Sequence, residues 1–223
     1  ARSGIRRLSL GLQSTSRAVL HRQSREDNPL GLMEAKLSQA RRAGITKVNL
    51  DLMYGLASQS AATIEADLAA VRRLSPEQVT LYELRPNRIG EDCPFSKDEL
   101  YHHYTLFFDG LSALGYKARF GQNTFTKDAP DEGVSSYLRS RMLEGVSYKG
   151  FGLSAQSMSR RGVSYNVGKV ARPDSALLAR STFSEQDTYL LPPEELAAKY
   201  IAISAYHGSF SLEHLSRMLG CDA

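Results

Sequence analysis

The sequence predicts an α/β protein whose strands form part of a parallel barrel, and three observations support this prediction. Three segments in the first half of the chain alternate apolar and polar residues with a period of two, as half-buried strands do. Amphipathic segments of helical length lie between them, which favours parallel βαβ units. Each predicted strand keeps one polar face, whereas a doubly wound sheet buries both faces. A barrel with a ligand-holding lumen therefore fits better than a flat, covered sheet.

The elements of this partial barrel follow one another closely along the chain. Apolar residues at spacings of three and four predict the longer helices, and Ser60 is the expected N-cap of the second of them. Gly44 is placed to end the first. The predicted strands are residues 5–13, 47–56 and 78–84, and the predicted helices are a short one within 14–27 and longer ones over 30–43 and 61–74.

The regular alternation of strands and helices stops after residue 84. A loop rich in proline, glycine and charge covers residues 85–99 and leads into a helix that is capped by Ser96 or Asp98 and ends at Gly115. Shorter predicted elements are a strand within 116–125, a helix over 134–143, and two final helices, one starting at Pro193 and one running from its cap Ser211 to Gly220.

Composition indicates an ordinary globular protein and excludes several classes. The 223 residues carry a net charge of +4, but aromatic residues are not interleaved with the arginine pairs, so we expect no nucleic-acid partner. No apolar run approaches the roughly 20 residues of a membrane span and no signal peptide opens the chain, so we expect a cytoplasmic protein. The two cysteines, Cys93 and Cys221, and the scattered histidines form no metal-binding pattern, and we predict no metal site in this sequence.

Asp51 is the most informative polar residue, because it lies within a strand on the face opposite Val48, Leu50 and Leu52. In a barrel this face is the lumen, where a carboxylate can accept hydrogen bonds from both hydroxyls of a ribose. A buried ion pair with Arg25 or Arg7 is an equal alternative.

Other polar residues near the predicted strand ends have competing interpretations. Gln13 either contacts a ligand or satisfies loop backbone, and Arg25 either pairs with a ligand carboxylate or is solvated. Arg85 follows the third strand, on the side where barrel enzymes bind ligands. The glycine-rich segment 149–162 forms either a tight turn packed on the core or a ligand wall of main-chain amides. No arrangement of nucleophile, base and acid stands out, so we assign no catalytic residue.

Four blocks of the sequence resemble the oxygen-independent coproporphyrinogen III oxidase family of radical S-adenosylmethionine (SAM) enzymes. They are RLSLGLQS, RAGITKVNLDLMYGLASQS, LSPEQVTLYEL and YKGFGLSAQSMS, in the order and spacing of the family. The strongest is G-x-x-x-(V/I)-N-(L/I)-D-L-(I/M)-(Y/F)-G-L followed by Gln59, although Ala57 replaces the proline that is usual in the turn.

The resemblance implies the C-terminal part of a partial (β/α)6 radical SAM barrel followed by a mostly helical region. We expect strands four to six of the barrel in residues 4–95, a helix and irregular segment that closes the active site in 96–170, and the start of a helical domain in 185–223. The family binds a [4Fe–4S] cluster through C-x3-C-x2-C, which this sequence lacks. We therefore expect a fragment of a longer protein that is inactive alone.

The resemblance also implies SAM as cofactor, bound by Gln13, Arg25 and Asp51. Arg85 and Gln156 fall at positions that line the family's SAM pocket but differ in type from the usual residues. The implied reaction is oxidative decarboxylation of coproporphyrinogen III propionates to vinyl groups, with an electron donor such as flavodoxin or ferredoxin. Relatives that act as haem chaperones or haem-degrading methyltransferases share most of the blocks, so haem is the alternative tetrapyrrole partner.

Overall fold

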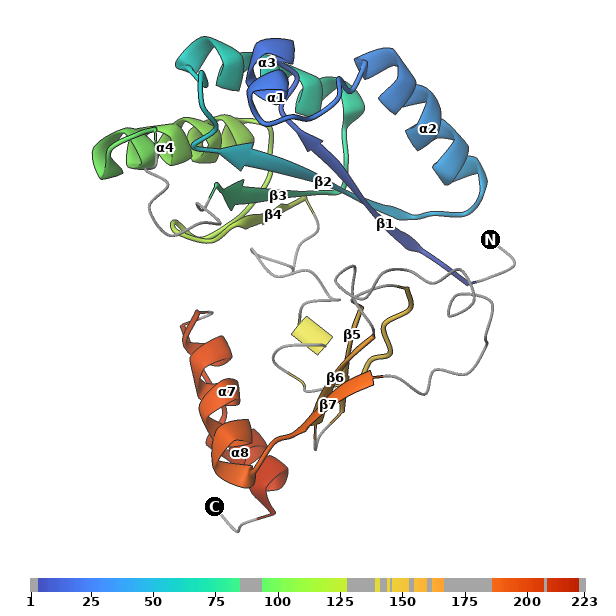
Figure 1. The fold of residues 1–223 in the computed structure, drawn as a ribbon, viewed down its shortest axis with the longest axis vertical. Coiled ribbons are helices and arrows are strands. Elements are labelled where there is room, and N and C mark those ends of the chain that lie inside the picture. The colour runs from blue at the N-terminus through green and yellow to red at the C-terminus, as the bar shows by residue number, and fades with distance from the viewer. Residues whose placement is uncertain are drawn as a thin grey trace. The chain divides into compact units, whose positions relative to one another are not determined.

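The computed structural model describes residues 4–84, 94–127, 139–140, 144, 146–152, 155–159, 162–166, 186–206 and 208–220. The chain divides into two compact units, Ala1–Ser135 and Ser136–Ala223. Figure 1 shows the elements of both units. The division between the units falls inside the expected segment 96–170, so α4 (Lys97–Ala113) and β4 (Thr124–Thr126) belong to the first unit.

The first unit is built on a four-stranded sheet with the order β1-β2-β3-β4. The first three strands are parallel, as the sequence predicts, and β4 runs antiparallel to β3. The strands are β1 (Arg7–Gln13), β2 (Lys47–Tyr54), β3 (Gln78–Glu83) and β4 (Thr124–Thr126). The predicted βαβ units are therefore confirmed, and the strand predicted within 116–125 is found only at the end of that range, as the short antiparallel edge strand β4.

The helices of the described residues in this unit all lie on one face of the sheet (Figure 1). They are α1 (Arg17–Arg22), α2 (Leu30–Arg42), α3 (Ala61–Leu74) and α4 (Lys97–Ala113). The alternate apolar strand residues point toward them, and Val48, Leu50 and Leu52 are fully buried. Phe107 of α4 and Phe125 of β4 complete the same core. Burial of each such side chain stabilises the fold by roughly 1.5–3 kcal/mol, so this apolar layer fixes the register of the strands.

The helices begin where the sequence places their caps. Ser60 accepts a hydrogen bond from the Thr63 amide, and the Thr63 side chain bonds back to the Ser60 amide, which makes a capping box. The α4 cap is Ser96 and not Asp98, because Ser96 and Glu99 form the same reciprocal pair. These bonds satisfy amides that the first turn of a helix cannot pair internally.

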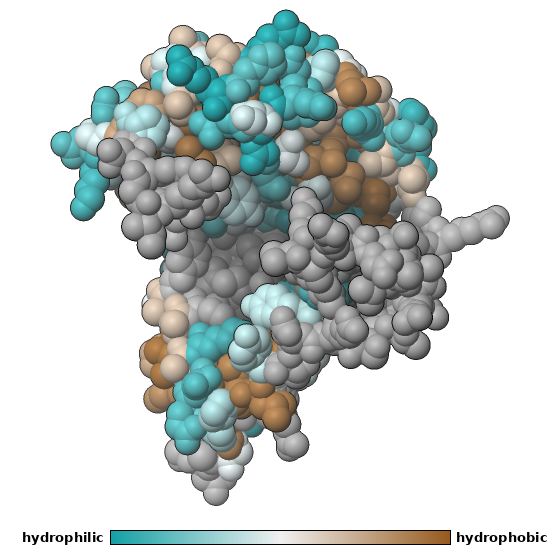
Figure 2. Space-filling view, in the orientation of Figure 1, coloured by the Kyte–Doolittle hydropathy of each residue, from teal (hydrophilic) through white to brown (hydrophobic). Residues whose placement is uncertain are grey.

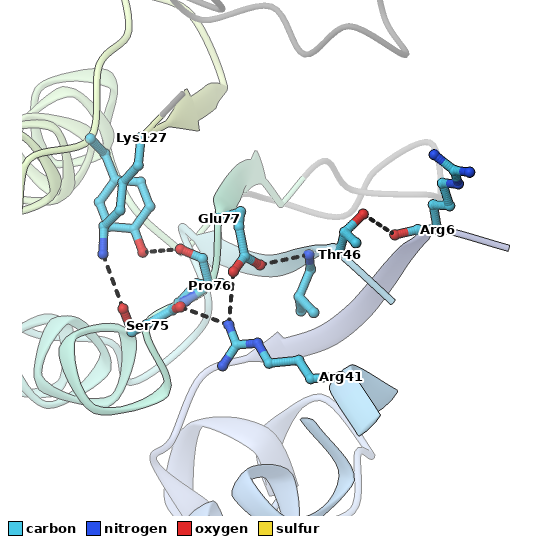
Figure 3. Close-up of polar contacts among 9 residues, drawn as sticks. Arg6, Arg41, Thr46, Ser75, Pro76, Glu77 and Lys127 are labelled. Atoms are coloured by element: carbon cyan, nitrogen blue, oxygen red, sulfur yellow. Dashed lines mark hydrogen bonds and ion pairs between the residues drawn. The ribbon is translucent and has the colours of Figure 1, made fainter. Parts of the chain in front are cut away.

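The amino ends of the strands are held together by charged side chains (Figure 3). Glu77 precedes β3 and accepts hydrogen bonds from the Val48 amide at 2.8 Å and from Arg41 of α2 at 3.0 Å. Arg41 also donates to the carbonyl of Ser75, and Lys127 donates to the Ser75 hydroxyl at 3.2 Å. This end of the sheet therefore joins a helix, two strands and the turn after α3 through side-chain contacts.

The second unit contains an antiparallel sheet that the sequence did not predict. Its strands β5 (Gln156–Ser159), β6 (Gly162–Asn166) and β7 (Gln186–Leu190) pair in chain order. The two predicted helices follow as α7 (Pro193–Tyr206) and α8 (Leu212–Leu219). Ser211 caps α8 and Gly220 ends it with φ 71°, as predicted. Of the helix predicted over 134–143, the structure describes only residues 139–140.

The surface of the two units differs in polarity. Hydrophilic residues cover most of the helical side of the first unit in Figure 2, while hydrophobic residues are also exposed on the α7–α8 pair. Phe210 and Leu212 of that pair are 48% and 67% exposed. Among the described residues, no helix combines the length and the hydropathy that crossing a bilayer requires.

Candidate functional site

The face of the first sheet opposite its helices is polar from one edge to the other. The strand pairing places residues from all four strands on this face at matching register positions. They are Arg7, Ser9 and Gly11 of β1, Asn49, Asp51 and Met53 of β2, Gln78, Thr80 and Tyr82 of β3, and Thr124 and Thr126 of β4. In a parallel α/β barrel this is the lumen face.

Asp51 is held in this face by a network of hydrogen bonds. Asn49 donates to Asp51 Oδ1 at 2.7 Å, and Ser9 donates to Asp51 Oδ2 at 3.2 Å. Asn49 also donates to the Ser9 hydroxyl at 2.8 Å and accepts from the Thr80 hydroxyl at 2.9 Å. The carboxylate therefore has a fixed orientation, and with two donors it retains acceptor capacity for a ligand.

Asp51 does not form the ion pair with Arg7 or Arg25 that the sequence left as an alternative. Arg7 directs its guanidinium to Gln78 Oε1 at 2.6 Å and acts on Asp51 only through its charge. Arg25 is exposed, and its backbone amide donates to the carbonyl of Leu20 behind α1. Asp51 is thus a hydrogen-bonded carboxylate.

The protonated form of Asp51 is more favoured in the protein than that of an aspartic acid in water. Burial raises the pKa of Asp51 above its usual range, and the hydrogen bonds from Asn49 and Ser9 and the Arg7 charge offset part of this rise. Burial also raises the pKa of Tyr82 on the next strand, and the negative charge of Asp51 adds to that shift. The Tyr82 phenol therefore stays protonated and can donate a hydrogen bond.

Gln13 ends β1 in an unusual backbone conformation. Its φ is 64°, in the left-handed region, and the pairing with β2 jumps from Gly11–Asp51 to Gln13–Leu52, which is a bulge. A Cβ atom added to Gly11 would lie 2.5 Å from Gln13 Nε2, so the glutamine amide occupies the space over Gly11. Since Gly11 is paired with Asp51, the bulge brings the Gln13 amide to the face that carries the carboxylate.

Gln156 lies in the second unit, where two tyrosines hold its amide. The Tyr148 hydroxyl donates to Gln156 Oε1, and Gln156 Nε2 donates to the Tyr165 hydroxyl at 2.6 Å. Gly150 packs against the same strand, since an added Cβ would lie 2.3 Å from the Gln156 carbonyl oxygen. At Gly150 the glycine-rich segment is therefore a close backbone contact rather than an open ligand wall. Arg85 lies outside the described residues.

Two features of the site escaped the sequence analysis. Asn49 connects Ser9, Asp51 and Thr80, which only the register of three neighbouring strands reveals. Asp67 of α3 is a fully buried carboxylate that binds the turn after β1. The sequence could have identified Asp67 from its position between Ile64 and Val71 on the apolar face of the helix, because a charged side chain there requires buried hydrogen-bond partners.

The residues present fit SAM better than they fit an iron–sulfur cluster. Asp51 with its free acceptor capacity suits the ribose hydroxyls, and the Gln13 amide can both donate and accept on the same face. A [4Fe–4S] cluster is ordinarily held by four cysteine thiolates, whereas the sequence has two cysteines. The described part of the chain contains no group of three metal-ligating side chains either.

The fold defines a class, because a parallel strand–helix sheet with one polar face is the architecture of a partial α/β barrel. Coproporphyrinogen III oxidase (HemN) from Escherichia coli, described as a radical SAM enzyme, superposes on the chain with a TM-score of 0.71 at 20% identity. The match covers 98% of this chain and 54% of HemN. The chain therefore has the fold of part of a radical SAM enzyme, as the sequence predicts.

Sequence comparison identifies the relatives. The chain is 33% identical over 123 residues to the haem chaperone HemW of Mycobacterium tuberculosis, covering 51% of this chain and 31% of that protein. Escherichia coli HemW is 34% identical over 123 residues, covering 52% and 32%. Escherichia coli oxygen-independent coproporphyrinogen III oxidase is 33% identical over 79 residues, covering 35% and 17%. No protein-family model matches the chain.

These findings confirm the resemblance read from the sequence: the chain is a homologue of HemW and of oxygen-independent coproporphyrinogen III oxidase (HemN). The chain spans about a third or less of the length of the curated relatives that it matches.

Proposed function

We propose that this chain forms the SAM-binding part of a radical SAM protein that acts on a tetrapyrrole. The observation that carries the proposal is the Ser9–Asn49–Asp51 network, which presents an oriented carboxylate on the polar face of the sheet. The names of the relatives, coproporphyrinogen III oxidase and haem chaperone, support a porphyrin or haem as the partner.

In this proposal each side chain has a separate role toward SAM. Asp51 accepts the two ribose hydroxyl hydrogens, and the Gln13 amide bonds a polar group beside it. Arg25, which is exposed, pairs with the carboxylate of the methionine part. The family resemblance makes Arg85 and Gln156 further candidates for contacts with SAM; Arg85 lies outside the described residues and Gln156 belongs to the second unit. When reductively cleaved, SAM supplies the means to remove a hydrogen atom from an unactivated carbon.

The first candidate reaction is the oxidative decarboxylation of coproporphyrinogen III. A propionate side chain loses a hydrogen atom from the carbon next to the ring, then carbon dioxide and one electron, and a vinyl group remains. Basic residues suit the substrate carboxylates, and we assign this role to Arg85, Arg88, Arg160 and Arg161, which lie outside the described residues. The electron donor is a small redox protein such as flavodoxin or ferredoxin.

The second candidate is a haem-binding role like that of HemW. The observation that favours it is the length of the match, which extends over 123 residues with HemW and 79 with the oxidase. A haem-degrading methyltransferase of the same superfamily is a further alternative with no specific observation in its favour.

The proposal is tested first by SAM binding, measured by isothermal titration calorimetry on the 223-residue chain and on the complete product of its gene. We expect Asp51→Ala to weaken binding at least tenfold, because a charge-assisted bidentate contact contributes more than about 1.4 kcal/mol. Asp109→Asn removes an exposed carboxylate from α4 and is the matched control, with an unchanged Kd. Equal affinities for the parent chain and Asp51→Ala would refute the proposed site.

The two candidate activities are separated in the complete, cluster-loaded protein under anaerobic conditions. Vinyl product together with 5′-deoxyadenosine supports the oxidase. Stoichiometric haem binding in an absorbance titration, without conversion of coproporphyrinogen III, supports the chaperone.

A further inference from the structure

Asp67 of α3 is the one fully buried carboxylate among the described residues, and the proposed SAM site does not use it directly. Its Oδ1 atom accepts three hydrogen bonds, from the Thr15 amide at 2.5 Å, the Thr15 hydroxyl at 2.7 Å and the Ser14 hydroxyl at 3.2 Å. Its Oδ2 atom has no hydrogen-bond partner in the described part of the chain. A buried, half-satisfied carboxylate is costly, so its presence calls for a role.

The turn that Asp67 binds comes directly after Gln13. The Ser14 amide donates to the Leu12 carbonyl at 2.8 Å, and the Ser14 hydroxyl accepts from the Ser16 amide at 3.1 Å. The chain therefore reverses within three residues of the bulge. Among the described residues, every hydrogen bond of the Asp67 carboxylate is with this turn, on the helix-covered side of the sheet.

Gln13 needs such support, because its backbone is strained. A left-handed conformation in a residue other than glycine costs about 1–2 kcal/mol and persists only where the surroundings hold it. Leu12 before it is fully buried in the core, and the Ser14–Thr15 turn after it is bonded to Asp67. Between these two fixed points Gln13 is left with one conformation, in which its amide lies over Gly11.

We propose that Asp67 is a positioning residue that acts through the Ser14–Thr15 turn to hold the Gln13 amide over the polar face beside Asp51. This inference rests on the proposed function only for the ligand, SAM, that Gln13 binds. The positioning itself is a property of the chain without ligand.

The variants follow from the pattern of the three bonds. Asp67→Ala removes the acceptor, whereas Asp67→Asn keeps an acceptor oxygen at Oδ1 and places its amide group at the unpartnered Oδ2 position. Thr15→Val removes one of the three donors and keeps the size of the side chain and the backbone amide. Asp67→Asn is thus the conservative rescue, and Thr15→Val is the milder variant should Asp67→Ala not fold.

The first measurement is made by NMR on the chain without ligand. We expect the chemical shifts of the Gln13 and Thr15 amides to change in both Asp67→Ala and Thr15→Val. In Asp67→Ala the exchange of the Thr15 amide hydrogen with solvent should also accelerate at least tenfold. Asp67→Asn should resemble the parent chain. Unchanged Gln13 shifts in both disruptive variants would overturn the proposal.

The second measurement is the Kd for SAM in a double-mutant cycle. We expect Asp67→Ala to weaken binding about tenfold in the parent chain, Thr15→Val about threefold, and Asp67→Ala less than twofold in a Gln13→Ala background. Loss of affinity that is equal in both backgrounds would overturn the positioning role and leave Asp67 as a structural residue. If Asp51→Ala does not weaken SAM binding, the proposed function fails, while the Gln13 shifts still decide the role of Asp67.

Discussion

Replacement of Asn49 by alanine tests the arrangement of the polar face most directly. Asn49 is 1% exposed, and its amide takes part in three of the four side-chain hydrogen bonds that connect Ser9, Asp51 and Thr80; the fourth runs directly from Ser9 to Asp51. The substitution removes one hydrogen bond to a carboxylate, which contributes about 1.5–3 kcal/mol, and two between neutral groups, which contribute about 1 kcal/mol each. Because water can replace part of these bonds on a half-buried face, we expect a loss of about 2–4 kcal/mol in the free energy of unfolding.

Asn49→Ala should also change the acid–base behaviour of Asp51. The hydrogen bond from Asn49 is one of the contacts that lower the pKa of Asp51 against the rise caused by burial. Its loss should therefore raise the pKa of Asp51 further, which a carbon-13 NMR titration of the carboxyl carbon measures. The less firmly held carboxylate should bind SAM at least fivefold more weakly.

Thr80→Val is the matched control for this experiment. It removes the hydroxyl that donates to Asn49 Oδ1 but leaves both bonds to Asp51 in place. We expect a loss of about 1–2 kcal/mol in stability with little change in the pKa of Asp51 or in the Kd for SAM. If the two variants have the same pKa and the same Kd, Asn49 does not orient Asp51 and our description of the network is wrong.

Three further predictions concern stability. Asp51→Asn should gain stability relative to the parent chain as the pH rises above about 3.8. Because the pKa of Asp51 is raised in the folded state, the folded parent binds more protons than the unfolded chain above this pH, and the parent therefore loses stability as the pH rises. A constant difference in urea midpoint between pH 3 and 7 would contradict this. Glu77→Ala should cost about 1–3 kcal/mol by thermal unfolding, with an unchanged Kd for SAM, because its bonds to Val48 and Arg41 lie at the amino ends of the strands. Gly150→Ala should disrupt the pairing around Gln156, since the new Cβ would lie 2.3 Å from the Gln156 carbonyl oxygen. Gly31→Ala has open space around the new Cβ and should stabilise α2 by up to about 1 kcal/mol. Thermal melts followed by circular dichroism compare the two variants.

The sequence predicted the first unit well because its apolar pattern and its local caps agree. The alternation of Val48, Leu50 and Leu52 and the capping serine Ser60 each depend on residues that are neighbours along the chain. The Gln13 bulge and the bonds of Asp67 depend instead on where distant segments meet, and no local pattern specifies them. The antiparallel strands β5 to β7 are short and give little alternation, so they were missed.

The candidate site shows the same limit. The face that Asp51 occupies follows from strand alternation, but exclusion of the ion pair required the positions of Arg7, Ser9 and Asn49 across two strands. Gln13 was a candidate from its place at the end of a strand and from the family blocks. Its left-handed backbone could not be predicted, because glutamine has no preference for that conformation.

The two ends of the first sheet are built from opposite kinds of interaction. At the amino ends, Arg41 and Glu77 pair with each other and with backbone groups, an arrangement that stabilises the fold. Toward the carboxyl ends, burial raises the pKa of both Asp51 and Asp67, so ionisation of these groups makes the fold less stable at neutral pH than at a pH where they are protonated.

The backbone strain at Gln13 adds a further cost at the carboxyl end. Ser75 at the amino end has a φ of 45°, but it is the C-cap of α3, where a left-handed residue satisfies a helix carbonyl. At Gln13 the left-handed residue closes a three-residue turn, in which the Ser14 amide donates to the Leu12 carbonyl, and such a turn is strained. Asp51→Asn removes the cost of the ionised Asp51 and should therefore stabilise the chain at neutral pH and weaken SAM binding together. A gain in stability without loss of SAM affinity would contradict the assignment of this end as the binding site.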